Sequence, residues 1–152
     1  MTSPPPPPDR TLQASLSSSL TAYHDFVQSV LDQLAEFGWH KSDLFAVHMA
    51  LEESISNAIR HGNKEDPEKK VQVDCQLSPA RFWVQICDEG DGFKPSAVPD
   101  CCAPDRLEVP GGRGLALIQA YMTVVQYNDL GNCLTMEKVL HPNSAARPKQ
   151  AN

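Results

Sequence analysis

The chain has 152 residues, of which 41% are hydrophobic, and a formal net charge of −6. This length and composition predict one domain with a single packed core, and they exclude a wholly disordered chain. The acidic balance disfavours binding to the phosphate backbone of a nucleic acid, because proteins that bind in this way normally carry a basic face.

The two ends of the chain are predicted to be disordered tails on a folded body at residues 11–140. Residues 1–10 hold five consecutive prolines, which favour an extended segment, and they lack the basic start and apolar run of a signal peptide. Residues 141–152 carry two prolines among mostly small or polar residues. The most apolar stretch, residues 115–125, is far shorter than the ~20 residues of a membrane span. We therefore expect a cytoplasmic protein with no membrane partner.

The first half of the body is predicted to form one strand and two helices. Apolar residues alternate with polar ones over residues 12–18, which predicts a first strand at a sheet edge. Apolar side chains recur at helical spacing over residues 23–37. A second helix, capped by Ser42 or Asp43, is expected to run to about residue 61. A glycine follows each predicted helix and provides a stop.

The second half is predicted to contain four strands, one helix and a long loop rich in glycine and proline. The strands are expected at residues 71–77, 82–88, 123–127 and 133–139, the loop at 89–110 and the helix at 114–121. Two or three helices on one face of a mostly antiparallel sheet form an α/β two-layer sandwich, which is the fold class we expect.

The five cysteines, Cys75, Cys87, Cys101, Cys102 and Cys133, contain no C-x-x-C pair and are odd in number. This spacing predicts neither a disulfide framework nor a zinc site. Cys75, Cys87 and Cys133 are interpreted as small hydrophobic residues of strands. Cys101 and Cys102 fall in the long loop, where either a redox role or an accidental exposed pair fits the pattern.

Three polar residues of the second helix, Glu53, Asn57 and His61, share a strip away from its apolar stripe when residues are spaced at about 100°. Glu53 and Asn57 are one turn apart, so their side chains are neighbours. Such a strip is usually the solvated side of an amphipathic helix. Asn57, however, is a poor residue for an exposed helix centre, which favours a functional role.

An acidic, glycine-rich segment, Asp88-Glu89-Gly90-Asp91-Gly92, follows directly after a predicted strand. An ionised aspartate only accepts hydrogen bonds, so Asp88 suits an N–H donor such as the amine of adenine. Gly90 and Gly92 let the backbone turn sharply and approach a ligand closely. A simple glycine-rich turn is the alternative interpretation.

A third segment, Gly111-Gly112-Arg113-Gly114, opens an apolar helix. Free N–H groups at a helix start form an anion site suited to phosphate, and the glycines permit close approach. Arg113 adds a positive charge that a phosphate could use. A flexible helix entry explains this short cluster equally well.

Taken in this order, the three segments resemble the gyrase/chaperone/histidine kinase/MutL ATPase superfamily: E-S-I-S-N-A-I-R-H-G at residues 53–62, D-E-G-D-G at 88–92 and G-R-G at 112–114. Within it, the compact length and the E-x-x-x-N-A-x-x-H-G form are similar to the anti-sigma-factor serine/threonine kinases of bacterial partner-switching systems. The resemblance covers roughly residues 44–138. It implies the Bergerat-type, histidine-kinase-like ATPase fold, with helices on one face of a mixed, mostly antiparallel sheet and ATP between the two layers.

The resemblance also implies roles for the polar strip of the second helix. Asn57 would be the ligand of Mg²⁺, an ion that takes oxygen ligands. Glu53 would be the general base that draws a proton from the attacking serine or threonine hydroxyl. His61 would lie beside the nucleotide.

The two glycine segments would hold the rest of the nucleotide, under a lid formed by residues 95–110. The residues implied are Asp88, Gly90 and Gly92 at the adenine, and Gly112, Arg113 and Gly114 at the phosphates. One departure stands out, because relatives often carry a threonine after a glycine between the last two strands, where this chain has Asn132.

The function implied is that of an anti-sigma-factor serine/threonine protein kinase that uses ATP and Mg²⁺. It would phosphorylate an anti-sigma-factor antagonist and sequester a sigma factor, and the resemblance suggests a homodimer. Because of the departure at Asn132, an alternative stays open, a nucleotide-gated binding module without kinase activity. A third reading is the catalytic domain of a split sensor histidine kinase.

Overall fold

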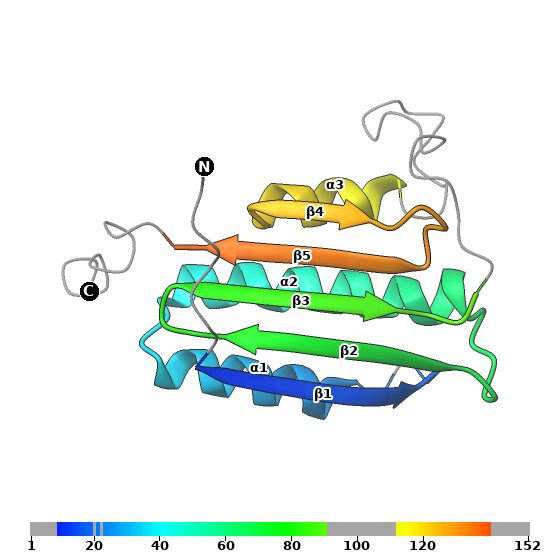
Figure 1. Cartoon of the computed structure of the whole chain (residues 1–152), viewed down its shortest axis with the longest axis horizontal. Helices are drawn as coiled ribbons and strands as arrows, with labels where there is room; N and C mark the ends of the chain where they lie inside the picture. The colour runs from blue at the N-terminus through cyan, green and yellow to red at the C-terminus, as the bar shows by residue number, and fades with distance from the viewer. Residues whose placement is uncertain (1–8, 20, 22, 91–111, 141–152) are drawn as a thin grey trace.

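The computed structural model describes residues 9–19, 21, 23–90 and 112–140 of the chain. The tails predicted at the two ends and the predicted lid lie outside these residues, apart from the first residues of strand β1. Within them a five-stranded sheet has the order β1-β2-β3-β5-β4 (Figure 1). The strands are β1 (Arg10–Ser17), β2 (Lys70–Leu77), β3 (Arg81–Cys87), β4 (Val124–Tyr127) and β5 (Cys133–Val139). All four pairings are antiparallel, whereas the resemblance implied a mixed sheet.

Four helical segments cover one face of this sheet, which confirms the two-layer architecture (Figure 1). They are α1 (His24–Glu36), α2 (Lys41–Asn57), η1 (Ala58–Gly62) and α3 (Gly112–Tyr121). In the view of Figure 1, α1 lies behind β1, α2 behind β3 and α3 behind β4. No helix within the described ranges is long and apolar enough to cross a membrane.

The predicted cap of the second helix is wrong. The helix α2 begins at Lys41, and its N-cap residue, His40, makes no side-chain capping bond. Asp43 instead lies in the first turn, where a negative charge interacts favourably with the helix dipole. Its carboxylate is also 3.7 Å from the Lys138 ammonium of β5, so it joins the helix start to the sheet.

The core lies between the sheet and the helices, and it follows the two periodicities of the sequence. Alternate residues of a strand point to the same face, so β2 and β3 each send every second side chain toward the helices. The apolar stripe of α2 meets them at helical spacing. Fully or almost fully buried members of this core include Val47, Leu51, Ile55, Val71, Val73, Leu77, Phe82, Val84 and Ile86.

The same alternation turns Cys87 and Cys133 to the opposite, outer face of the sheet, where they form a disulfide. The interpretation of these two cysteines as small hydrophobic residues of strands is therefore wrong. They are direct partners in the β3–β5 register, and neither the pairing of those strands nor its register can be read from cysteine spacing. Cys75 is a buried free thiol, as predicted, and burial raises its pKa to about 12.

Candidate functional site

The polar strip predicted on the second helix is present at the end of α2. Glu53 and Asn57 are both half-buried there, one turn apart. Beyond Asn57 the chain winds as the π-helix η1, and the Asn63 N–H donates to the carbonyl of Ala58, five residues earlier. The wider turn changes the angle per residue, so the predicted wheel does not extend to His61, whose side chain is exposed.

Asp88 follows β3 directly and is held from both sides. Its backbone N–H donates to the Asn132 carbonyl at 2.8 Å, and its carboxylate Oδ1 accepts the Gly90 N–H at 2.8 Å. Burial raises the pKa of this carboxyl group, while the Gly90 hydrogen bond and the Lys69 charge act in the opposite direction. Among the described residues Gly90 binds Oδ1, so Oδ2 is the oxygen that we expect to face a ligand.

Gly62 and Gly90 bring the end of the helix against the strand end. A Cβ on Gly62 would collide with the Asp88 carboxylate, and a Cβ on Gly90 would collide with the Gly62 carbonyl oxygen. Both positions therefore require glycine because of close approach. From the sequence, Gly62 is predicted only to stop the helix, although its place directly after His61 in the motif is a usable signal for close packing.

Tyr127 is influenced by the charge of one carboxylate from each of the first two predicted segments. It lies opposite the buried Leu134 in the β4–β5 register, so its side chain is on the helix-covered face. Burial, followed by the negative charges of Asp88 and Glu53, raises the pKa of its phenol to about 12. Both carboxylates, one from α2 and one from the end of β3, therefore act on one phenol. A single tyrosine in a strand gave no sequence signal for this position.

The third segment forms a helix start, as predicted. The helix α3 begins at Gly112 and packs against α2. Its first N–H groups have no partner within the helix, which leaves donors for an anion. The side chain of Arg113, the residue Gly92 and the predicted lid lie outside what the structure describes.

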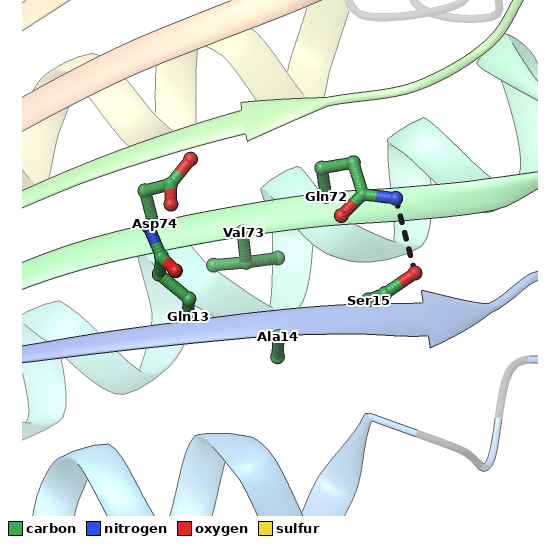
Figure 2. Close-up of a pocket in the computed structure, with 6 residues that line it drawn as sticks. All are labelled: Gln13, Ala14, Ser15, Gln72, Val73 and Asp74. Atoms are coloured by element: carbon green, nitrogen blue, oxygen red, sulfur yellow. Dashed lines mark hydrogen bonds between the residues drawn. The ribbon is translucent and has the colours of Figure 1, made fainter.

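A shallow hollow of about 350 Å³ lies elsewhere, across β1 and β2 (Figure 2). Its polar side chains stand on the outer face of the sheet, where Gln72 donates to the Ser15 hydroxyl at 3.0 Å. The lining residues are Gln13, Ala14, Ser15, Gln72, Val73 and Asp74, none of them a predicted site residue. The hollow is therefore separate from the site around Asp88.

Comparison with known proteins points to the same fold and family. Residues 16–138 match the family model of the histidine kinase-like ATPase domain. Among curated proteins, the anti-sigma F factor of Oceanobacillus iheyensis is 29% identical over 87 residues, which are 55% of this chain and 59% of that protein. The serine-protein kinase RsbW of Bacillus subtilis is 28% identical over 115 residues, 70% of this chain and 71% of that protein. The first match thus spans less than two thirds of its relative.

A solved structure agrees with the architecture. The crystal structure of the RsbU and RsbW domains of a Mycobacterium tuberculosis protein superposes with a TM-score of 0.53 at 19% identity, covering 88% of this chain and 33% of that one. This likeness bears on the fold alone. A domain of the matched family implies ATP binding, and the site around Asp88 is built from the segments expected to bind it. Because the family model covers most of the sequence, the chain belongs to the histidine kinase-like ATPase domain family.

Proposed function

We propose that this protein is a cytoplasmic anti-sigma-factor serine/threonine protein kinase, which binds Mg·ATP, phosphorylates an antagonist protein and sequesters a sigma factor as a homodimer. The observation that carries the proposal is the contact between two of the motifs, because Gly62 at the end of the helix motif lies against the Asp88 carboxylate. This contact, together with the effect of the Glu53 and Asp88 charges on Tyr127, supports a site with a candidate base and a candidate adenine acceptor on one side of the sheet. The names of the distant relatives, an anti-sigma factor and a serine-protein kinase, support the same activity.

In this proposal each part of the nucleotide meets a group suited to it. The Oδ2 atom of Asp88 accepts the adenine amine, and the N–H groups that open α3 at Gly112 hold phosphate oxygens. The amide oxygen of Asn57 suits Mg²⁺, which would neutralise charge on the phosphates. Glu53, one turn before Asn57, takes the proton of the attacking hydroxyl. Positioning and charge neutralisation are the main demands of phosphoryl transfer.

The contacts of Asn132 favour a place for it at the adenine end of the site. Its carbonyl accepts the Asp88 N–H, and its Nδ2 lies 3.4 Å from the Asp88 carbonyl oxygen. Its Oδ1 also accepts a hydrogen bond from Asn128 at 2.8 Å. A side chain engaged in this way supports the strand end rather than the terminal phosphate. The alternative function, a nucleotide-gated binding module without kinase activity, rests on this departure from the family pattern.

Replacing Asp88 by asparagine tests the proposed adenine contact. The Oδ1 of an asparagine can still accept the Gly90 N–H, so its NH₂ group takes the place of Oδ2. The NH₂ group and the adenine amine are both donors, so they cannot form a hydrogen bond with each other. Loss of a hydrogen bond to a charged group predicts binding of Mg·ATP weaker by at least about tenfold, measured by titration calorimetry. Binding of the variant as tight as that of the wild type would contradict the proposal.

The stability of the same variant separates lost function from lost folding. Burial raises the pKa of Asp88 in the folded state above its ordinary value of 3.8. The contribution of Asp88 to folding stability is therefore fully present below its ordinary pKa, where the group is protonated. It is lost as the pH rises through the raised pKa of the folded state. Asp88→Asn removes this loss, so the unliganded variant is expected to melt at or above the wild-type temperature at pH 7. A clear drop in melting temperature would contradict this account of the site.

Replacing Gly90 by alanine tests the close approach of the two glycines. The new methyl group would meet the Gly62 carbonyl, so the turn that carries Asp88 must move. Overpacking of this kind costs on the order of 1–3 kcal/mol, and a displaced Asp88 predicts at least about tenfold weaker binding of Mg·ATP.

Gly38→Ala is the matched control for this variant. Gly38 has a φ of +93° and nothing within 4 Å of a built Cβ, so alanine there is strained but far from the site. It should lower stability by roughly 1–2 kcal/mol and leave ATP affinity unchanged. Equal loss of affinity in the two variants would mean that stability, and not the geometry at Asp88, limits binding.

A further inference from the structure

Asn63, the residue that follows η1, has a fully buried polar side chain and no role in the proposed function. Its amide makes three hydrogen bonds to three different segments. Nδ2 donates to the Ser18 hydroxyl at 2.9 Å and to the Lys70 carbonyl at 3.0 Å, and Oδ1 accepts the Glu89 N–H at 2.7 Å. Such an amide holds its segments together, because each lost partner would leave a buried polar group unsatisfied.

The bond to Glu89 reaches the candidate site. Glu89 lies between Asp88 and Gly90, so Asn63 anchors the middle of the turn that begins with the Asp88 carboxylate. The carboxylate of Glu89 in turn accepts the Lys70 N–H at 2.6 Å, next to the carbonyl that Asn63 binds. The turn is therefore tied to the start of β2 by its side chain and to Asn63 by its backbone.

The neighbouring glycine contact does not replace this bond. Gly62 touches Asp88 and Gly90 by van der Waals contact, which excludes a closer approach but does not stop the turn from sliding or lifting away. A hydrogen bond is directional and weakens steeply when it is bent. The Asn63–Glu89 bond is thus a directional restraint on the height and orientation of the turn.

We infer that Asn63 is a positioning residue for adenine recognition, which fixes the Asp88 carboxylate by holding the Glu89 N–H. This inference rests on the proposed function. Guanine carries a carbonyl oxygen where adenine carries its amine, so a correctly placed carboxylate favours ATP over GTP. Asn63 therefore contributes to nucleotide selectivity without contacting the nucleotide.

Titration calorimetry with ATP and with GTP, on full-length variants shown by circular dichroism to be folded, tests this inference. Asn63→Ala removes the restraint on the turn. We expect it to weaken ATP binding at least about tenfold and GTP binding much less, so that the ratio of the two affinities falls toward unity.

Two further variants separate positioning from stability. Asn63→Asp keeps an acceptor for the Glu89 N–H but loses both donated bonds, so it should melt earlier and yet retain the preference for ATP. Ser18→Ala is the matched control, because it removes a partner of Asn63 on the side away from Glu89. It should lower the melting temperature and leave the ATP-to-GTP affinity ratio unchanged.

Hydrogen exchange in the wild-type protein adds a measurement that needs no variant, since the Glu89 amide should exchange slowly. Exchange at the rate of an unprotected loop amide overturns the inference. So does an Asn63→Ala variant that keeps the wild-type affinity ratio, or one that loses affinity for ATP and GTP equally. Failure of the proposed function looks different: the wild type would then bind no ATP, or Asp88→Asn would bind it normally, and the inference would fall with it.

Discussion

Replacing Glu53 by alanine is expected to lower phosphoryl transfer from ATP to a serine- or threonine-containing antagonist by at least about 100-fold, because general-base catalysis contributes roughly 10²–10⁴-fold. Glu53 is half-buried near the end of α2, and its carboxylate acts on the same phenol as that of Asp88. ATP binding should change little, since in the proposed site the base faces the attacking hydroxyl. Transfer of radiolabelled phosphate to the antagonist measures the rate, and calorimetry measures the affinity.

Glu52→Ala is the matched control for this experiment. Glu52 is the adjacent carboxylate, and it pairs with His48 at 3.0 Å. Exposed ion pairs one helical turn apart typically contribute about 0.3–0.5 kcal/mol to stability. Loss of the Glu52 carboxylate should leave the transfer rate nearly unchanged. Normal transfer by Glu53→Ala would show that the assigned base is wrong. ATP binding by the wild type with no transfer to any antagonist would instead favour the nucleotide-gated binding module.

Reducing the Cys87–Cys133 disulfide is expected to lower the free energy of unfolding by about 4 kcal/mol, because it removes a cross-link from the unfolded chain. The two cysteines are 46 residues apart in sequence, so the open chain gains the freedom of a long loop. The melting temperature should fall by roughly 10 °C. Urea denaturation with and without a dithiol reductant measures the change. Cytosolic reductants keep most protein thiols reduced. The stability of the reduced protein is therefore the value that applies in the proposed cytoplasmic compartment.

The double variant Cys87→Ser/Cys133→Ser provides the control, because it removes the bond without a reductant. It should match the reduced wild type in stability, and the reductant should have no further effect on it. An effect of the reductant on the double variant would point to other thiols. Equal stability of oxidised and reduced wild type would contradict the expected contribution of the disulfide.

Much of the fold could be predicted because its elements follow local patterns. The alternation over residues 71–77 and the helical spacing over residues 23–37 each describe one buried face, and the structure has β2 and α1 there. The start of α2 was harder to predict, since several polar residues near Lys41 could each act as a cap. The change to a π-helix at Ala58 gave no recognisable sequence signal, so the angle per residue assumed for the predicted strip does not apply beyond Asn57.

The candidate site was predictable only in part, for a related reason. Short motifs whose chemistry can be recognised in the sequence contain Glu53, Asn57 and Asp88. Tyr127 and Asn63 act through neighbours that are distant in sequence, and neither belongs to a motif. A buried amide in a turn looks the same in sequence as a solvated one, because its partners are supplied by other strands.

By itself, the sequence determined the order and type of most helices and strands, the two-layer class, and the three segments that are expected to bind ATP. These follow from residue patterns a few positions long, in which burial and hydrogen bonding have a fixed period. Only the tertiary structure decided that Cys87 meets Cys133, and that Gly62 lies against Asp88. It also decided that Asn63 holds the turn after β3 through the Glu89 N–H. The reason is physical: strand register and the packing of a helix end on a strand end depend on the whole sheet at once. A register shift of one residue would turn Cys87 or Cys133 to the other face of the sheet and break their pairing.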